Sequence, residues 1–207
     1  MKTKEEFILE KLKELYPDAK CALNYNKDYE LLIATVLSSQ CTDKRVNMVT
    51  KELFSKYDIF SLKDASLDDI EKIIYSVGTH KKKAIFIKNI ANELVSKYNG
   101  IVPNDRAFLE SLSGVGRKTC NVVLSNIYGV PAIAVDTHVK RVSNRLGLVK
   151  TDDVSKIEKI LMKKFPKDEW IFLHHGLIMF GRNICKSQNP KCEECPFKDI
   201  CKYKKRD

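Results

Sequence analysis

Four cysteines lie close together near the carboxyl end of the chain, and thiolates at short spacing are metal ligands. They are Cys185, Cys192, Cys195 and Cys201, in the pattern C-x6-C-x2-C-x5-C. Four soft thiolates can hold zinc or an iron–sulfur cluster. Tetrathiolate zinc ribbons usually carry two C-x2-C pairs about 15–20 residues apart, and this chain has one such pair. The spacing therefore favours a 4Fe–4S cluster over zinc, and also over disulfides, because the charged first residues are unlike an export signal.

A second candidate site is the segment Leu112-Ser-Gly-Val-Gly-Arg-Lys-Thr-Cys120, which lies between two predicted helices. Gly114 and Gly116 predict a tight hairpin that can adopt positive φ. Backbone N–H groups there could approach a phosphate closely, and the positive end of the following helix would help to bind it. Such a site contacts the nucleic-acid backbone without reading the sequence. A plain helix–turn–helix corner remains the alternative.

Lys118 is expected in the first turn of that following helix, beside Arg117. The helix dipole, the neighbouring cation and partial burial would each disfavour its ammonium form. A neutral lysine amine can act as a nucleophile. A second phosphate contact at a basic helix start explains the same residue equally well from spacing alone.

Asp136 lies in the segment Ala132-Ile-Ala-Val-Asp-Thr-His138, just before an apolar helical face. Aspartate is a preferred N-cap, and this role is predicted here. A capping carboxylate stays ionised and fixed, so it could also stabilise developing positive charge on a sugar or orient a water. His138 follows two residues later, where a histidine is more often a structural hydrogen-bonding residue than a base.

The formal net charge of +10 favours a polyanionic partner, with nucleic acid first and an anionic membrane surface second. No apolar run approaches the roughly 18 residues that a membrane span needs. Seven cysteines without a secretory signal imply a reducing compartment, which we expect to be the cytoplasm.

The rest of the chain is predicted to be almost entirely helical, because apolar residues recur at helical spacing and Gly and Pro are sparse. Asp28, Thr42 and Ser66 are candidate N-caps. Asn99-Gly100 should end a long helix. A domain boundary is expected near 129–132. Later helices are expected at 104–112, 116–128, 137–147, 153–164 and 168–180.

At this point the motifs carry a family resemblance. The segment Leu37-Ser-Ser-Gln40-Cys-Thr-Asp43, the hairpin with Lys118, the Val-Asp136-Thr-His motif and the terminal cysteine loop occur in this order. Together they resemble endonuclease III, a DNA glycosylase with abasic-site lyase activity in the helix–hairpin–helix superfamily. The resemblance covers nearly the whole chain, from Phe7 to Tyr203.

The resemblance implies an all-α fold of two helical lobes with a DNA-binding cleft between them. Residues 22–130 would form a six-helix barrel domain that contains the helix–hairpin–helix. Residues 1–21 and 131–207 would form the iron–sulfur cluster domain. The partner would be double-stranded DNA with damaged pyrimidines or abasic sites, bound by a monomer, with no membrane involved.

The resemblance also implies residue roles. Lys118 would attack the anomeric carbon, displace an oxidised or ring-saturated pyrimidine, and cut the strand by β-elimination through a Schiff base. Asp136 would be the essential carboxylate. Gln40 would fill the gap left by the flipped nucleotide, although an exposed helix-end amide is the simpler interpretation. The residues expected to contact DNA are Gln40, Gly114, Gly116, Arg117, His138, Lys186 and Lys191.

One segment departs from the family pattern. After Val77-Gly78 the family usually carries a bulky apolar wedge, whereas this chain has Thr79-His80, followed by three lysines at 81–83. Threonine is a poor wedge, because insertion between bases needs an apolar body. His80 could stack in its place. The lysines could hold phosphates or could simply be a solvated charge run.

Two other functions remain open. A monofunctional mismatch glycosylase of the same superfamily would typically lack a lysine at the hairpin position, so Lys118 argues against it. A non-catalytic iron–sulfur DNA-binding or electron-transfer module would explain the charge and the cysteines. Such a module would not explain Lys118 and Asp136, because neither residue would have a catalytic role in it.

Overall fold

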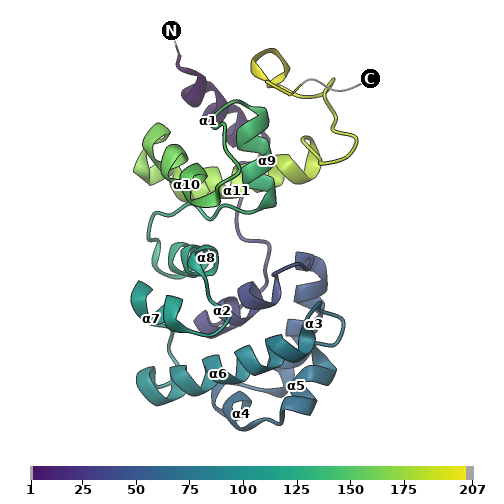
Figure 1. The fold of residues 1–207 in the computed structure, drawn as a ribbon, viewed down its shortest axis with the longest axis vertical. Helices are drawn as coiled ribbons and strands as arrows, with labels where there is room; N and C mark the ends of the chain where they lie inside the picture. Colours follow the sequence, from purple (N-terminus) through teal and green to yellow (C-terminus); the bar gives the residue numbers. More distant parts are fainter. Residues whose placement is uncertain (1, 204–207) are drawn as a thin grey trace. The chain divides into compact units, whose positions relative to one another are not determined.

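The computed structural model describes residues 2–203, and their regular structure is helical throughout. This confirms the predicted all-α fold (Figure 1). None of the described helices is long and apolar enough to cross a membrane. The helices are α1 (Lys4–Leu15), α2 (Asp28–Leu37), α3 (Asp43–Lys56), α4 (Ile59–Asp64), α5 (Leu67–Ile73), α6 (His80–Tyr98), α7 (Arg106–Ser111), α8 (Arg117–Tyr128), α9 (Thr137–Arg145), α10 (Val154–Lys164) and α11 (Trp170–Asn183), with short 3-10 turns η1 (Lys167–Glu169) and η2 (Lys198–Ile200).

The chain divides into two compact units. The hairpin unit is Cys21–Tyr128 and contains α2 to α8. The cysteine unit joins the described residues up to Lys20 with those from Gly129 onward, and contains α1 and α9 to α11.

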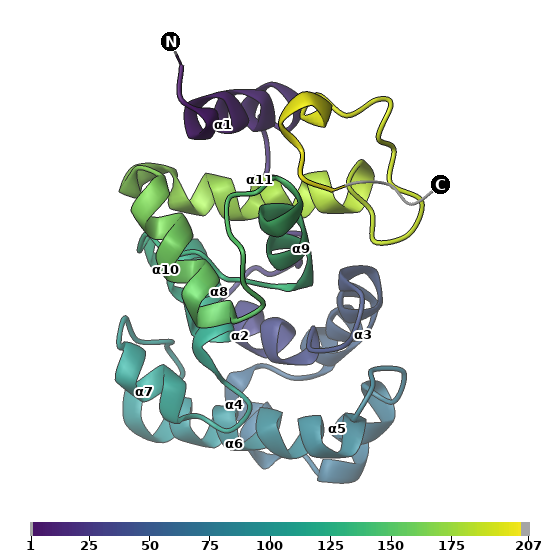
Figure 2. The ribbon, with the colours of Figure 1, turned by 45° about the horizontal axis from the view of Figure 1, so that its top comes forward.

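The hairpin unit is built around α2, whose residues from Tyr29 to Leu37 are all buried. A helix that is buried on every side needs partners on several faces, and α2 packs against α3, α6 and α8. The long helix α6 lies along α4 and α5 (Figures 1 and 2). The packing of α6 against α2, α4 and α5 fixes the start of α6 relative to the end of α2.

Local capping signals set most helix boundaries in this unit. Thr42 and Ser66 cap α3 and α5 as predicted, each accepting a hydrogen bond from the third backbone N–H of its helix. Asn99 and Gly100 end α6 with φ values of 49° and 81°.

The prediction for Asp28 was wrong, because Lys27 is the N-cap of α2 and Asp28 is its first residue. The Asp28 carboxylate accepts a hydrogen bond from the backbone N–H of Val102 at 2.6 Å. The same carboxylate also accepts one from Tyr29 N–H at 2.8 Å. Asp28 therefore ties the loop after α6 to the start of α2, a long-range contact that outcompetes the local cap.

The cysteine unit is built around α11, which packs against α1 and α9, while α10 packs against α9 (Figure 2). Ile8 and Leu12 of α1 are fully buried. Gly176 of α11 lies against α1, since a Cβ built there would lie 3.5 Å from Leu12 Cβ, an ordinary van der Waals distance. The aromatic ring of Phe197 is fully buried and packs on Phe180, with ring centroids 5.0 Å apart. This contact attaches the cysteine loop to the core.

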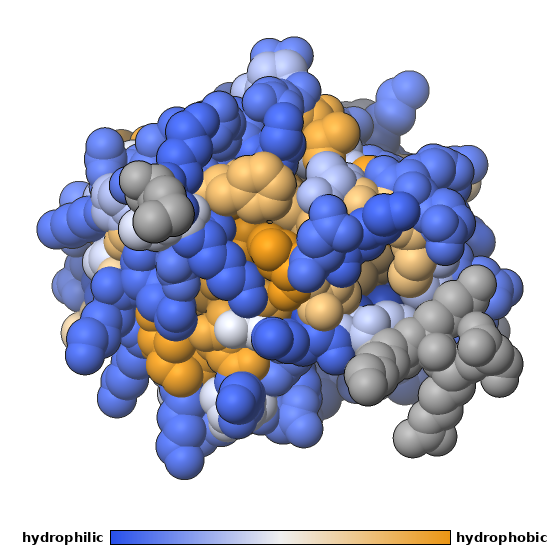
Figure 3. Space-filling model, turned by 90° about the horizontal axis from the view of Figure 1, so that it is seen from above, coloured by the Kyte–Doolittle hydropathy of each residue, from blue (hydrophilic) through white to orange (hydrophobic). Residues whose placement is uncertain are grey.

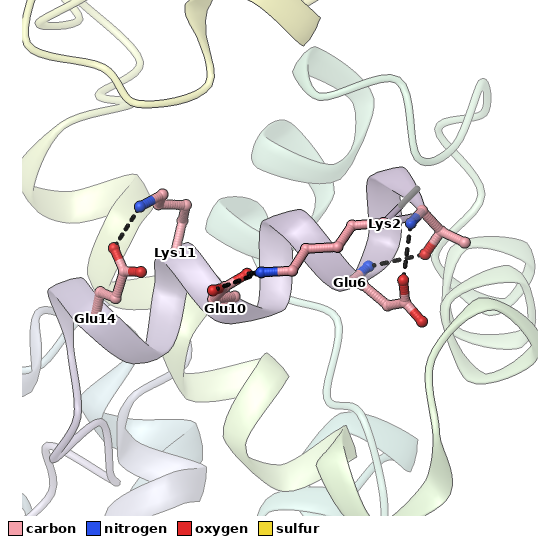
Figure 4. A network of polar contacts seen from close by, with 6 residues as sticks. Lys2, Glu6, Glu10, Lys11 and Glu14 are labelled. Atoms are coloured by element: carbon pink, nitrogen blue, oxygen red, sulfur yellow. Dashed lines mark hydrogen bonds and ion pairs between the residues drawn. The ribbon is translucent and has the colours of Figure 1, made fainter.

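The outer face of α1 is held by polar contacts (Figure 4). Thr3 and Glu6 form a reciprocal capping box. Two ion pairs follow along the helix, Lys2 with Glu10 at 2.7 Å and Lys11 with Glu14 at 2.6 Å. Exposed pairs of this kind contribute roughly 0–1 kcal/mol each, so the burial of Ile8 and Leu12 stabilises the docked helix more than these pairs do.

The face drawn in Figure 3 is mostly hydrophilic, with apolar side chains gathered toward its middle.

A buried histidine in α11 generates a prediction about stability and pH. His175 is 5% exposed, and its Nε2 has no hydrogen-bond partner within the described residues. Burial, with a smaller effect of Arg182, lowers the pKa of His175 from 6.5 to about 4. The unfolded chain therefore binds a proton below pH 6.5 that the folded chain binds only near pH 4. We expect the free energy of unfolding to fall by about 3 kcal/mol from this group over that range.

The measurement is chemical denaturation between pH 7 and pH 4. His175→Leu should flatten the pH dependence, because the variant has no titrating group at this buried position. An unaltered pH profile in His175→Leu would contradict this assignment.

Candidate functional site

The predicted hairpin is residues 112–116, between α7 and α8. Gly114 has φ +83°, and a Cβ at this position would lie 2.5 Å from Cδ2 of Phe86. Both the backbone conformation and the packing therefore require glycine at 114. Gly116 differs from the prediction, because it is not among the residues with positive φ. A Cβ at Gly116 would meet no atom within 4 Å, so its backbone borders open space that a ligand could occupy.

Arg117 and Lys118 are the first two residues of α8, and both are exposed. The predicted partial burial of Lys118 was therefore wrong. The position in the first turn of the helix is as expected. An exposed amine beside an open glycine backbone at a helix start is accessible to a phosphate or to a sugar carbon.

Asp136 is the N-cap of α9, and its carboxylate accepts a hydrogen bond from the backbone N–H of Val139 at 2.8 Å. This confirms the predicted cap. The four residues before it, Ala132 to Val135, are buried and hold the carboxylate on a fixed segment. The bond from a backbone N–H fixes the orientation of the carboxylate.

His138 is partly buried against α11, since a Cβ at Gly181 would lie 3.1 Å from His138 Cβ. Its Nδ1 lies 3.1 Å from Nη2 of Arg141. Burial is the main cause that lowers the pKa of His138. The charge of Asp136 raises this pKa, whereas the charges of Arg141 and Arg182 lower it further. The observed contacts are those of a structural hydrogen-bonding residue, and a DNA contact by His138 stays a prediction.

Gln40 is exposed in the turn between α2 and α3, with φ 56°. Thr79 is also in the left-handed region, with φ 59°, at the start of α6. The two turns are neighbours, because a Cβ at Gly78 would lie 3.9 Å from the carbonyl oxygen of Gln40. Gln40 and Gly78 are far apart in the sequence, so the sequence did not indicate that the two turns are neighbours.

His80 does not project freely beside Thr79. Its Nε2 lies 3.2 Å from Oε1 of Glu71, and its ring lies 4.8 Å from the ring of Tyr75, centroid to centroid. Tyr75 is 71% exposed. An aromatic pair therefore stands next to the position where the family usually has an apolar wedge.

The four predicted ligands lie in the loop after α11. Burial is the main cause that raises the pKa of Cys195, and the thiols of Cys185, Cys201 and Cys192 raise it further. The four sulfurs are thus near enough to interact electrostatically. The described cysteines form no disulfide.

The arrangement of the four thiols bears on which metal group they would hold. No group of three or more His, Cys, Asp or Glu side chains within residues 2–203 is arranged to hold one metal ion. Four thiolates on one zinc must all lie about 2.3 Å from a single point. In a 4Fe–4S cluster the four thiolates are shared among the irons of a larger body. Four thiolates in one loop, with a single C-x2-C pair, are a donor set that a 4Fe–4S cluster accepts.

Two arginines of α9 that the sequence did not single out bind this loop. The Arg141 guanidinium donates to the carbonyls of Gly181 at 2.8 Å and Cys185 at 3.1 Å. Arg145 donates to the carbonyl of Lys186 at 2.7 Å, and its Nη1 lies 3.5 Å from Sγ of Cys185. Their i, i+4 spacing on one helix was a visible signal, but nothing local identified their partners.

Lys186 and Lys191 are exposed, as a phosphate-binding role requires. Lys191 pairs with Glu194 at 3.1 Å, which partly offsets its charge. Of the other basic residues near the loop, Lys198 and Lys202 are exposed. Lys204, Lys205 and Arg206 lie outside the described residues.

Two known protein families match segments of this chain. Residues 33–167 match the model of the HhH-GPD superfamily of base excision DNA repair proteins. Residues 185–201 match the iron–sulfur binding domain of endonuclease III. The chain is 47% identical to endonuclease III of Bacillus subtilis, covering 98% of this chain and 94% of that protein. It is 39% identical to that of Escherichia coli K12, covering 99% and 98%.

Solved structures give the same result. A trapped endonuclease III–DNA covalent intermediate and a non-covalent endonuclease III–DNA complex each match with a TM-score of 0.92 and 50% identity. Both matches cover 98% of this chain, and they cover 97% and 96% of those chains. A thermostable thymine-DNA glycosylase, 24% identical over 97% of this chain and 96% of its own, has a TM-score of 0.83 and shares the fold.

The chain therefore belongs to the HhH-GPD superfamily of base excision DNA repair proteins and, within it, to the endonuclease III family. These matches confirm the predicted class of enzyme, a base-excision DNA glycosylase and lyase. They also confirm the 4Fe–4S cluster as the cofactor of the cysteine loop. When bound, the cluster supplies folding energy to this end of the chain.

Arg145 provides a test of how the protein holds the cluster. Arg145→Met removes the N–H groups that face Cys185 Sγ and the carbonyl of Lys186. Loss of such outer contacts typically weakens metal sites by about 10- to 100-fold. We expect iron release to a chelator, followed by loss of visible absorbance, to be faster by a factor of about ten or more.

The matched control is Lys140→Met on the same helix. Lys140 pairs with Asp152 at 3.0 Å and is not among the residues that bind the loop. Its iron should be released at the rate of the unmodified protein. Equal release rates for Arg145→Met and the unmodified protein would show that Arg145 does not stabilise the cluster.

Proposed function

We propose that this enzyme removes oxidised or ring-saturated pyrimidines from duplex DNA and then cleaves the strand 3′ to the resulting abasic site. The observation that carries the proposal is Lys118, an exposed amine in the first turn of α8 directly after the glycine hairpin. A protein that this chain matches along 98% of its length has been solved as a trapped covalent intermediate with DNA. A lysine amine is a group that can form such a bond.

The proposed DNA contacts follow from charge and exposure. The net charge of +10 supports a polyanionic partner. The hairpin backbone from Gly114 to Gly116, which borders open space at Gly116, and the exposed Arg117 would bind phosphates at the positive end of α8. Lys186 and Lys191 would add contacts from the cysteine loop. Gln40 would enter the space left by the extruded nucleotide, and His138 would lie beside the backbone.

In the proposed reaction the neutral Nζ of Lys118 attacks C1′ of the deoxyribose. The bond from C1′ to the base breaks, and the base leaves with its electron pair and takes up a proton. Opening of the sugar ring then gives an imine between Nζ and C1′. Loss of a proton from C2′ breaks the bond from C3′ to its oxygen and cuts the strand. Water finally hydrolyses the imine and frees the lysine.

Asp136 is the proposed carboxylate of the reaction. Its bond from Val139 N–H supports a fixed anion. A fixed anion stabilises the positive charge that develops on the sugar as the base leaves, and does so without reorganising. The carboxylate thus caps a helix and acts in the reaction at the same time.

We also propose that residues 22–130 are the six-helix barrel domain and that 1–21 with 131–207 form the cluster domain. The hairpin unit and the cysteine unit support these bounds to within two residues at each junction. We propose that the enzyme acts as a monomer. We also propose that it works in a reducing, cytoplasmic compartment, a proposal supported by seven cysteines without a disulfide within the described residues.

Lys118 can be tested by covalent trapping. Borohydride reduces an imine to a stable amine, so the unmodified enzyme should become joined to DNA that contains an abasic site. Lys118→Gln should still bind DNA through phosphate contacts but lose both trapping and strand cleavage. The measurement is gel mobility of labelled duplex after incubation with borohydride.

Two matched variants complete this test. Arg117→Gln removes the neighbouring cation and should weaken binding while trapping persists. Lys118→Arg keeps a cation but cannot supply a neutral nucleophile, so it should also fail to trap. Near-normal cleavage by Lys118→Arg, or a trapped peptide that contains another lysine, would show that Lys118 is not the nucleophile.

Asp136 can be tested without disturbing the helix. Asparagine is as good an N-cap as aspartate, so Asp136→Asn should melt within a few degrees of the unmodified enzyme. It should nevertheless lose base excision by about 100-fold or more, because the fixed charge is gone. Single-turnover excision and thermal melting are the two measurements. Normal excision by Asp136→Asn would reduce Asp136 to a structural cap.

A further inference from the structure

Lys83 is the last of three consecutive lysines at the start of α6, but it does not share their environment. Lys81 and Lys82 are exposed, whereas Lys83 is only 4% exposed. The expectation that all three form a solvated run or bind phosphates is therefore wrong for Lys83. A buried lysine needs an internal partner, because desolvation of an ammonium is costly.

The partners of Lys83 are backbone carbonyls of the hairpin unit. Its Nζ donates to the carbonyl of Leu37 at 3.0 Å and to that of Ser39 at 2.6 Å. Leu37 is the last residue of α2. Carbonyls at a helix end have no partner within the helix and carry the negative end of its dipole. Burial lowers the pKa of Lys83, against a smaller opposing effect of the Cys41 thiol.

These contacts join two turns that are distant in sequence. The turn after α2 carries Gln40, and the turn before α6 carries Gly78 and Thr79. The two turns meet where a Cβ at Gly78 would lie 3.9 Å from Gln40 O. Lys83 lies in the first turn of α6 and bonds to the carbonyl directly before Gln40.

Both turns hold a residue in an unfavourable conformation. Gln40 and Thr79 have φ values of 56° and 59°, in the left-handed region that side chains with a Cβ rarely adopt. Such conformations persist only where surrounding contacts enforce them, and they cluster at functional sites. A buried ammonium bonded to the adjacent backbone is a contact of that kind.

We propose that Lys83 is a positioning residue that holds the Gln40 turn against the Thr79 turn, so that both side chains are presented together to the duplex when a nucleotide is extruded. The proposal rests on the proposed function, since it assigns Gln40 and Thr79 to the opened base pair. Lys83 itself touches no DNA. Threonine is a weak wedge, so Gln40 contributes more than Thr79 to filling the space that the extruded nucleotide leaves.

The test uses the full enzyme with its cluster and three DNA probes. The probes are a duplex with one oxidised pyrimidine, the same duplex with 2-aminopurine beside the lesion, and a single strand with one abasic site. Lys83→Met has nearly the shape of lysine without its charge. It should lower single-turnover excision from the duplex by about 10- to 100-fold, and should abolish the 2-aminopurine fluorescence rise that reports unstacking.

Cleavage of the single-stranded abasic site should be unchanged in Lys83→Met, because no duplex has to be opened there. This probe also separates the two proposals. If the unmodified enzyme cleaves no abasic DNA, the proposed function fails. If it does and Lys83→Met excises from the duplex at the normal rate, only the role of Lys83 fails.

Lys81→Met is the matched control, since it removes the same group from an exposed position two residues away. If Lys81 contacts a phosphate, the slope of log affinity against log salt should fall by about one. Lys83→Met should leave that slope unchanged. A reduced slope in Lys83→Met would overturn the proposal, because it would mean that Lys83 binds DNA directly.

A double variant tests whether Lys83 acts through Gln40. In a Gln40→Ala background, Lys83→Met should add little further loss of excision, since residues that act together are not additive. Losses that multiply in full would overturn the proposal. Should Lys83→Met fail to fold, Lys83→Gln replaces it. Its amide keeps N–H donors but ends one atom short of the ammonium, so we expect a smaller loss of excision from the duplex, and an unchanged rate would overturn the proposal.

Discussion

Every α helix leaves backbone N–H groups unbonded at its start and carbonyls unbonded at its end, and the proposed sites of this protein lie at such ends. Asp136 satisfies a donor at the start of α9. Lys83 satisfies carbonyls at the end of α2, and Arg141 does so at the end of α11. The start of α8, which follows the glycine hairpin, is the end where we propose that a phosphate binds. Helix ends thus supply both the structural contacts and the binding surface.

In the cysteine unit, contacts along one helix connect Asp136 with the cysteine loop. Asp136 caps the first turn of α9, and Arg141 and Arg145 further along the same helix bind the backbone around Cys185. The loop is anchored from its other side by Phe197, which is buried against Phe180. A helix that carries the proposed carboxylate is therefore held by the segment that binds the cluster. This gives the cluster a structural reason to be present in an enzyme whose reaction needs no electron transfer.

The hairpin unit shows how similar residues acquire different roles. Lys81, Lys82 and Lys83 are chemically identical, yet only Lys83 faces the end of α2 and is buried. The cation at Lys83 opposes the dipole of its own helix, and the carbonyls of α2 offset that cost. Thr79 lies where the family usually has an apolar wedge, and the tilted rings of Tyr75 and His80 lie next to it.

The sequence by itself determined the features whose causes are local. The N-caps at Thr42, Ser66 and Asp136 each bond three residues ahead, and the helical periodicity and the cysteine spacing are read over similarly short distances. Gly114 was also predictable as a turn residue, although its contact with Phe86 was not. The family resemblance added the proposed roles of Lys118 and Gln40, which no local rule supplies.

The tertiary structure decided the contacts that join distant segments. Lys83 bonds to carbonyls 46 and 44 residues away, and Arg141 to one 44 residues away. Asp28 bonds to Val102 across 74 residues and so gives up the predicted cap. The backbone partners of these side chains are carbonyls, which accept, or an N–H group, which donates. Such groups occur all along the chain, so the sequence does not show which of them will be used. Only the packing of the helices determines which of these groups a buried charge can reach.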